Sequence, residues 1–178
     1  MLRERAANFP IEFLYVRDDD IPTYVKDGVA DIGIVGRNEY DEKGYQLEVV
    51  RDLKFAACRL SIAVPHDFDY KGLESLEGKR IATSYPNILM SILSAKGISA
   101  TPVVVSGSVE ITVQVGIADC ICDIVSTGTT LKMNGLKEVE PIYWSTAVMI
   151  ARQNFLSDEK EKAEIFARLL ERMDALML

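Results

Sequence analysis

The stretch Asp123-Ile-Val-Ser-Thr-Gly-Thr-Thr130 opens with an acid, passes through Gly128 and ends in small hydroxyl residues. Residues 120–125 are apolar and β-branched, which predicts a short buried strand. Residues 129–133 can begin a helix with a threonine as its N-cap. A strand that passes to a helix through such a turn presents backbone N–H groups to an anion, because these groups add to the positive end of the helix dipole.

The composition of this turn points to a phosphorylated sugar. Glycine lets the backbone come close to a phosphate, and each hydroxyl can donate a further hydrogen bond. The carboxylate of Asp123 would repel a phosphate, but it suits sugar hydroxyls or a magnesium ion. The alternative is an ordinary hydroxyl-rich turn with a good N-cap, and both interpretations stay open on this stretch alone.

Outward from this turn, the sequence repeats one pattern. Residues 21–36 and 109–125 each contain a short helix, a glycine, an aliphatic residue, Ala-Asp and then a buried strand. A helix that ends at a glycine and leads into a buried strand, twice in one chain, predicts two similar α/β lobes. Glycine caps before buried strands are common, so coincidence is the alternative; the shared Ala-Asp favours two lobes.

Strand and helix signals alternate between the two copies. Residues 79–83 and 101–106 are predicted strands, and 88–97 is a predicted helix between them. This order predicts a mostly parallel sheet that is buried on both faces. Ligands of such sheets bind beyond the carboxyl ends of the strands. We expect three loops to converge there on one ligand, namely 84–87, 106–108 and 126–130.

The chain is expected to cross between the lobes near residues 58–61 and 144–146, like the two hinge strands of a clamshell. The outer lobe then comprises residues 60–144, and the inner lobe combines residues 1–59 with 145–178. The inner lobe shows no strand–helix unit ahead of residues 11–17. We therefore expect this lobe to be incomplete at its N-terminus, with an exposed edge that favours a homo-oligomer.

Composition and charge exclude several functions. The 178 residues are 48% hydrophobic, which is enough for a full core, and the net charge of −7 argues against nucleic-acid binding. No secretory leader or membrane-spanning run is apparent, and three cysteines without framework spacing fit a reducing cytoplasm. The single histidine, His66, excludes the commonest metal sites and most histidine-based triads.

Taken in order, these motifs resemble the catalytic core of ATP phosphoribosyltransferase, the first enzyme of histidine biosynthesis. The matching stretches are 16–22, 28–36, 58–60, 80–86, 107–110 and 116–131. The resemblance implies a two-lobed α/β fold like that of type II periplasmic-binding proteins. It also implies that N1 of ATP attacks C1 of phosphoribosyl pyrophosphate and expels pyrophosphate, with Mg²⁺ present. The implied partners are these two small molecules, with no nucleic acid and no membrane.

The resemblance assigns the phosphate and the ribose to particular residues. The loop that would hold the 5′-phosphate consists of Ser126, Thr127, Gly128, Thr129 and Thr130. Asp119 and Asp123 would lie near the ribose. Asp119 comes four residues earlier, about 13 Å away at the usual rise of a strand, so both acids cannot contact one pair of hydroxyls. Asp123 therefore ranks first and is proposed as catalytic.

Arginine side chains are the candidates for the pyrophosphate or triphosphate oxygens. Arg17, predicted at a strand end, is the catalytic candidate because a guanidinium binds such groups with two hydrogen bonds. The alternative for Arg17 is a surface salt bridge to the acids at 18–20. Arg59 is a weaker substrate-binding candidate of the same type, as is Arg37.

Two further residues complete the predicted substrate site. Tyr85 could stack on the ligand or bond to it, and its alternative is a packed turn, since a proline follows it. Glu110 ends the matching stretch 107–110 and is predicted to bind substrate.

The sequence departs from the family pattern at both ends. Family members begin with a strand and a loop that contains Gly-Arg-Leu, and longer members end in a regulatory domain that binds histidine. We therefore expect this chain alone to be an incomplete or weak catalyst. Two other functions stay open: a non-catalytic clamshell that binds a small anion, as a solute-binding or sensor module, and a phosphoribosyltransferase of the purine-salvage type. The duplicated unit argues against the latter, whose folds have one lobe.

Overall fold

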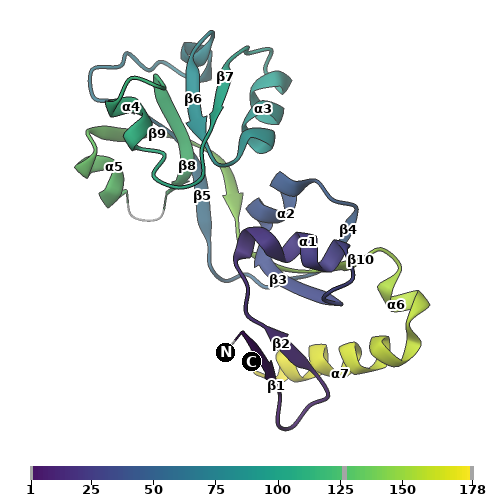
Figure 1. Ribbon diagram of the computed structural model, residues 1–178. Coiled ribbons are helices and arrows are strands. Elements are labelled where there is room, and N and C mark those ends of the chain that lie inside the picture. The colour runs from purple at the N-terminus through teal and green to yellow at the C-terminus, as the bar shows by residue number, and fades with distance from the viewer. Residues whose placement is uncertain (1, 126–127, 177–178) are drawn as a thin grey trace. The chain divides into compact units, whose positions relative to one another are not determined.

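The computed structural model describes residues 2–125 and 128–176, and Figure 1 shows the course of the chain through its helices and strands. The chain divides into two compact units. The first unit comprises Met1–Val35, Tyr45–Asp52 and Val148–Leu178, and the second comprises Gly36–Gly44 and Leu53–Ala147. Each unit combines segments that are distant in sequence.

The first unit is built on a three-stranded sheet whose strand order is β3-β10-β4. Its central strand β10 (Ala147–Arg152) has an apolar, buried run over residues 147–151, which explains why it lies between two neighbours. β10 pairs antiparallel with β4 (Leu47–Asp52), with Val148 opposite Asp52. The third strand is β3 (Ile32–Gly36).

The remaining elements of the first unit are one hairpin and several helices. The hairpin pairs β1 (Arg3–Arg5) with β2 (Glu12–Leu14) in antiparallel register. The helices are a 3₁₀ turn (Asp18–Asp20), α1 (Ile21–Lys26), α6 (Phe155–Asp158) and α7 (Lys160–Leu176). Phe166 on α7 packs edge to face on Phe155, so α6 and α7 meet through aromatic side chains.

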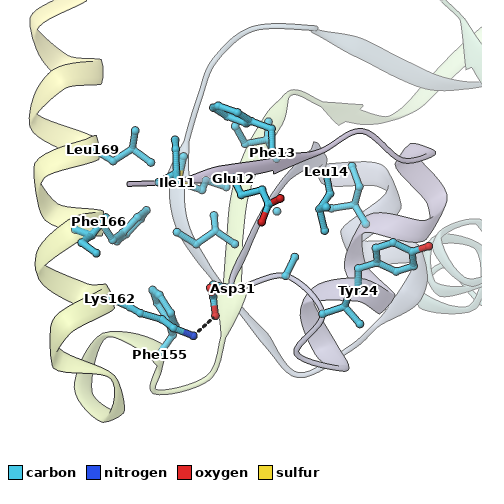
Figure 2. Close-up of a pocket in the computed structure, with 18 of the residues that line it drawn as sticks. Ile11, Glu12, Phe13, Leu14, Tyr24, Asp31, Phe155, Lys162, Phe166 and Leu169 are labelled. Atoms are coloured by element: carbon cyan, nitrogen blue, oxygen red, sulfur yellow. Dashed lines mark hydrogen bonds and ion pairs between the residues drawn. The ribbon is translucent and has the colours of Figure 1, made fainter. Parts of the chain in front are cut away.

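A cavity of about 560 Å³ lies within the first unit, between β2, α1, β3 and α7. Its lining is mostly apolar, and Figure 2 shows Ile11, Phe166 and Leu169 among the side chains that face it. The ion pair between Lys162 Nζ and Asp31 Oδ1, at 2.8 Å, lies at its polar side. The cavity therefore suits apolar groups and does not resemble the predicted phosphate site.

The second unit is built on a five-stranded sheet with the order β7-β6-β8-β5-β9. The three strands predicted to be parallel are so: β6 (Arg80–Thr83) runs parallel to both β7 (Thr101–Val104) and β8 (Cys120–Val125). The long strands β5 (Cys58–Pro65) and β9 (Leu136–Ser145) run antiparallel at the other side of β8. The sheet is therefore mixed, with a parallel half that ends at Thr83, Val104 and Val125.

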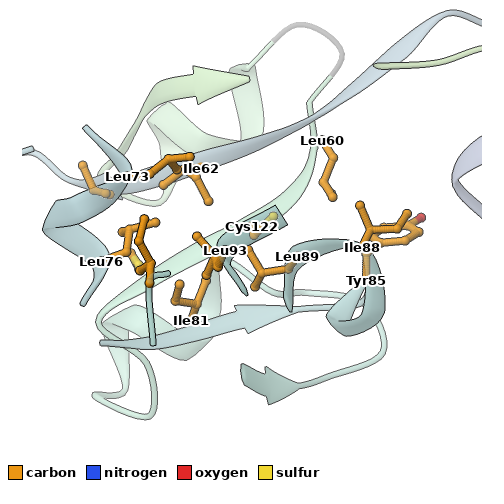
Figure 3. Close-up of a cluster of buried hydrophobic side chains, with 13 residues drawn as sticks. Leu60, Ile62, Leu73, Leu76, Ile81, Tyr85, Ile88, Leu89, Leu93 and Cys122 are labelled. Carbon is orange, nitrogen blue, oxygen red and sulfur yellow. The ribbon is translucent and has the colours of Figure 1, made fainter. Parts of the chain in front are cut away.

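Two hydrophobic clusters cover the two faces of this sheet. On one face, Leu60, Ile62 and Leu89 belong to the larger cluster, which Figure 3 shows. On the other face, Ile121 and Val125 pack with small residues of β5 and β6 and with Leu131 and Leu136. Alternate residues of β8 thus enter different cores, as expected for a strand buried on both faces. The helices of this unit are α2 (Arg37–Lys43), a 3₁₀ turn (Leu73–Leu76), α3 (Pro86–Ala95), α4 (Ile111–Gln114) and α5 (Thr129–Met133).

α2 packs with the second unit through buried polar contacts. Glu42, which is 9% exposed, accepts hydrogen bonds from the N–H groups of Asn87 and Ile88 at 2.9 and 3.0 Å. In return, Asn87 Nδ2 donates to the Glu42 carbonyl oxygen at 2.9 Å. The first turn of α3 is therefore capped by a carboxylate from another helix. This packing places residues 36–44 with the second unit, whereas the lobe boundaries expected from sequence grouped them with residues 1–59.

Replacing Glu42 should destabilise the second unit. Glu42→Ala leaves two buried N–H groups without their acceptor, and we expect a loss of about 1–3 kcal/mol in the free energy of unfolding. Lys43→Ala, at the exposed neighbouring position of the same helix, should change it by less than about 0.5 kcal/mol. Denaturant titration followed by circular dichroism measures both. Equal stability of the two variants would show that the cap contributes nothing.

Candidate functional site

The site begins where the parallel strands of the second unit end. We call this the ligand edge, defined by the last residues of β6, β7 and β8, which are Thr83, Val104 and Val125. Beyond β8, Gly128 is the N-cap of α5, and its φ of +74° lies in the left-handed region that favours glycine. Thr129 is thus the first residue of the helix rather than its cap. The predicted strand, glycine turn and helix are all present; Ser126 and Thr127 lie outside the described residues.

Asp123 lies beside this turn on the sheet face that carries Ile121 and Val125. Its Oδ1 accepts a hydrogen bond from the N–H of Ile124 at 2.8 Å. Burial, with a smaller contribution from the charge of Glu110, raises the pKa of Asp123 from 3.8 to about 6. Glu110 is the N-cap of α4. The structure therefore brings Asp123 and Glu110 together near the Gly128 turn, and a strongly shifted carboxylate is typical of functional sites.

Arg59 also lies at the ligand edge, because β5 runs antiparallel to β8 and places Arg59 directly opposite Val125. Its guanidinium binds Glu138 with two hydrogen bonds, from Nε to Oε1 at 2.6 Å and from Nη2 to Oε2 at 2.7 Å. The hydroxyl of Ser61 donates to the same Oε1 at 2.7 Å. These bonds, with that from Arg59 as the largest cause, lower the pKa of Glu138.

Neither Glu138 nor Ser61 is among the residues predicted from the sequence. Glu138 is a carboxylate within the predominantly buried or half-buried strand β9, and such a position is one signal that could have identified it. Ser61 is fully buried in β5 and lies opposite Asp123 in the register. That Glu138 contacts Arg59, and that Ser61 lies opposite Asp123, becomes visible only when the pairing of the strands is known.

Tyr85 is packed rather than open. Its ring is 9% exposed and belongs to the larger hydrophobic cluster, while its hydroxyl donates to Glu39 Oε1 at 2.7 Å. Asn38 Nδ2 donates to the same hydroxyl at 3.2 Å. The structure shows the packed turn that was the alternative for Tyr85, and a direct contact with a ligand stays a prediction. The amides that open α3 next to it are occupied by Glu42.

Asp119 lies at the opposite end of β8, before its first residue Cys120. Arg80 binds it with Nη2 to Oδ1 at 2.7 Å, and the Arg80 backbone N–H donates to Oδ2 at 2.8 Å. These hydrogen bonds lower the pKa of Asp119. The structure does not bring Asp119 to the Gly128 turn.

Arg17 belongs to the first unit, immediately before the 3₁₀ turn Asp18–Asp20. Its side chain is 78% exposed, and Nε donates to Asp19 Oδ1 at 3.0 Å. The surface salt bridge that the sequence analysis considered is therefore present. A pair this exposed contributes little to stability, so it does not compete strongly with an anionic ligand.

The fold defines an α/β protein of the periplasmic-binding-protein class, with a left-handed glycine before α5 at the ligand edge. Solved folds that resemble it include an alkanesulfonate-binding protein from Xanthomonas axonopodis (17% identical, TM-score 0.54, 90% of this chain and 61% of that one). The fold also resembles a histidine kinase sensor domain with similarity to periplasmic binding proteins (17% identical, TM-score 0.58, covering 89% of this chain and 72% of that one). These likenesses confirm the predicted fold class.

Sequence similarity identifies the family. A model of the ATP phosphoribosyltransferase (HisG) family matches residues 17–175, and the chain belongs to this family. It is 53% identical to the ATP phosphoribosyltransferase of Parabacteroides distasonis and 51% identical to that of Bacteroides thetaiotaomicron. It also matches a solved chain of the HisG:HisZ complex from Thermotoga maritima (29% identical, TM-score 0.78, 97% of this chain and 86% of that one). The predicted family resemblance is confirmed.

The matches to these two relatives cover 97% of this chain but only 60% of the length of each relative. The activity of the whole relatives therefore does not transfer to it directly. In the parts that the structure describes, no helix is both long and apolar enough to cross a membrane.

The shifted pKa of Asp123 predicts a stability effect of defined sign. Because the folded-state pKa of about 6 exceeds the ordinary value of 3.8, the native state loses stability as the pH rises between these values, and the full cost applies above them. We expect Asp123→Asn to be more stable than the parent by about 1–3 kcal/mol at pH 8, with no difference below about pH 4. Thermal melts across this range measure the effect.

Asp119→Asn is the matched control, because the pKa of Asp119 is shifted the other way. Its stabilising contribution is present above the ordinary pKa and is lost as the pH falls through the folded-state pKa. This variant should therefore be less stable than the parent at pH 8. A common sign for the two variants would contradict the assigned environments.

Proposed function

We propose that this chain binds phosphoribosyl pyrophosphate and transfers its phosphoribosyl group to N1 of ATP, releasing pyrophosphate, as in the first step of histidine biosynthesis. One observation carries the proposal: Gly128, in the left-handed conformation, opens α5 at the ligand edge, and the half-buried carboxylate of Asp123 lies beside it. Membership of the ATP phosphoribosyltransferase family supports the assignment of this turn to the 5′-phosphate.

The reaction separates charge, and the site is suited to stabilise it. Breaking the bond between C1 and the pyrophosphate oxygen builds positive charge on the sugar and negative charge on the leaving group. Near neutral pH the carboxylate of Asp123 is largely ionised, so it can accept hydrogen bonds from ribose hydroxyls and stabilise the positive sugar. The amides at 128–130 would hold the phosphate, and Thr129 and Thr130 can add hydroxyl donors.

The leaving pyrophosphate needs positive charge, which we assign to Arg17 and to magnesium. Among the described residues, no three His, Cys, Asp or Glu side chains gather where they could hold a metal ion. Mg²⁺ commonly keeps several waters and substrate phosphates and uses only one or two carboxylates. Asp123 and Glu110 fit that limited role toward an ion carried by pyrophosphate, and such an ion would neutralise charge on the leaving oxygens.

A second candidate function follows from the fold. The solved proteins that resemble it include one that binds alkanesulfonates, and a clamshell of this kind can capture a small anion without reacting. The two functions differ in one measurement. On addition of ATP to the chain with phosphoribosyl pyrophosphate, the enzyme releases pyrophosphate and forms phosphoribosyl-ATP, whereas a binding module releases none.

We also propose that the enzyme acts in the cytoplasm and associates with further copies of itself. The similarity to one chain of a HisG:HisZ complex supports association in general. In the strand order of the first sheet, β3 and β4 are the outer strands, and outer strands are where a sheet can extend.

Replacing Gly128 should remove phosphate binding beyond any loss of stability. Gly128→Ala strains a backbone with φ +74°, at a cost of about 1–2 kcal/mol, and adds a methyl group at the turn. Gly97→Ala is the matched control, because Gly97 has φ +73° at the end of α3 and open space around its Cβ position. Calorimetric titration with phosphoribosyl pyrophosphate should detect at least about tenfold weaker binding for Gly128→Ala only. Equal weakening of both variants would assign the effect to strain.

Replacing Arg17 should impair turnover without affecting folding. Arg17→Ala removes a 78% exposed side chain, so the melting temperature should stay unchanged while pyrophosphate release falls about 100-fold. Arg3→Ala is the control, because Arg3 is 67% exposed and pairs with Glu12 in the same unit. A coupled pyrophosphate assay gives both rates. Parent-like turnover of Arg17→Ala would remove Arg17 from the mechanism.

A further inference from the structure

We propose that Glu138 is a positioning residue, which holds the guanidinium of Arg59 over the sheet face that carries Asp123, so that Arg59 can bind a phosphate or pyrophosphate group of the substrate. The inference rests on the proposed function, because it takes the turn at Gly128 as the site of an anionic substrate. It adds to that function a residue from β9, a strand that contributes no other candidate.

The strand register places Arg59 beside the substrate turn. β5 and β8 are antiparallel, so Arg59 at the beginning of β5 lies opposite Val125, the last residue of β8. Along β5, Arg59 alternates onto the same face as Ser61 and Ala63, and Ala63 packs in the cluster that contains Val125. Arg59 therefore shares a sheet face and a sheet end with the Gly128 turn.

Glu138 fixes the conformation of that arginine. Two parallel hydrogen bonds of 2.6 and 2.7 Å join Nε and Nη2 of Arg59 to the two carboxylate oxygens of Glu138. A planar guanidinium held along one edge has a defined direction for all its donors, which a single hydrogen bond would not impose. The Arg59 and Glu138 side chains are 34% and 24% exposed, so the pair is partly shielded from water.

Ser61 holds Glu138 in turn. Its hydroxyl donates to Glu138 Oε1 at 2.7 Å, and the serine itself is completely buried. The carboxylate therefore has three donors from two residues of β5. Such a chain of buried serine, carboxylate and guanidinium is a supported side chain rather than a loose surface ion pair.

The same strand supplies a contrasting carboxylate. Glu140 lies opposite Ile62, whose side chain belongs to the other hydrophobic cluster, and it accepts a hydrogen bond from the Tyr70 hydroxyl at 2.5 Å. A bulge in the register between Ile62 and Ala63 sends Glu138 and Glu140 to different faces. Glu140→Gln is therefore a matched control for Glu138→Gln, with the same chemical change two positions along one strand.

The first measurement tests the positioning without any substrate. In the full chain, the Arg59 Nε–H signal in a proton–nitrogen correlation spectrum should exchange slowly with water, since this group donates to Glu138. Glu138→Gln should make its exchange at least about tenfold faster, as for a lost charge-assisted hydrogen bond, whereas Glu140→Gln should leave it unchanged. An unchanged signal in Glu138→Gln would overturn the positioning role whatever the protein binds.

The second measurement tests the consequence for binding. With inorganic pyrophosphate as the probe, Glu138→Gln should bind about tenfold more weakly than the parent, and Glu140→Gln should bind like the parent. Because Glu138 acts through Arg59, the double variant Arg59→Gln/Glu138→Gln should bind no more weakly than Arg59→Gln alone. Ser61→Ala, which keeps both charged groups, should show a smaller loss in the same direction.

The outcomes separate this inference from the proposed function. Additive losses in the double variant, or parent-like or tighter binding by Glu138→Gln, would overturn the role of Glu138 while the substrate site stands. Absence of pyrophosphate binding in the unsubstituted chain would contradict the proposed function, and the inference would fail with it. If Glu138→Gln unfolds, Glu138→Asp takes its place, because it keeps the charge and shortens the side chain. Parent-like pyrophosphate binding together with slow exchange of the Arg59 Nε–H supports the positioning role. Parent-like binding together with fast exchange overturns it.

Discussion

Burial of β8 on both faces is the constraint on which the second unit depends. Its cysteines enter one core and Ile121 and Val125 enter the other, so nearly every position of the strand is committed to packing. Asp123 is the exception, since it is an acid in a position that packing would give to an apolar residue. Burial disfavours the charged form of this carboxylate. The hydrogen bond from the backbone N–H of Ile124 offsets part of that effect, and the pKa of Asp123 nevertheless stays raised. Such a cost within a central strand is typical of positions that serve function rather than stability, which favours the proposed role of Asp123.

At the ligand edge, the first turns of α3 and α5 differ in whether a protein group already accepts hydrogen bonds from their N–H groups. α3 begins with N–H groups that the buried Glu42 already accepts, so its first turn is satisfied from within the unit. α5 begins at Gly128, and within the described residues no side chain caps it. A negatively charged ligand gains more at α5, because at α3 it would have to displace a carboxylate that is held by two amides. The loops at 84–87 and 128–130 therefore differ in what they can bind, although the sequence analysis assigned both to one ligand.

The sequence predicts those features that depend on local pattern. The buried strand at 120–125, the glycine turn after it and the acid at Asp123 follow from residues within ten positions of one another, and the structure contains each of them. The pairs Arg59–Glu138 and Arg80–Asp119 join residues 79 and 39 positions apart. They depend on strand order and register, which a single sequence does not determine. The packed turn at Tyr85 was one of two predictions, but the partner of its hydroxyl was not predictable, because Glu39 lies on a helix from a distant segment.

The sheet carries the same chemical pair twice, and only position separates the roles that we assign to the two pairs. Arg80 and Asp119 form a two-point contact at the amino ends of β6 and β8. Arg59 and Glu138 form another, which extends from Arg59, opposite Val125, along β5 to Glu138, opposite Ala63. Geometry and residue type are alike, so neither motif nor pKa distinguishes a structural pair from a functional one. The polarity of the parallel strands does, because it collects helix N-termini at one edge and leaves the other edge with none. An arginine at that first edge adds its charge to the field of the helix, and a carboxylate that orients it contributes to binding without contacting the ligand.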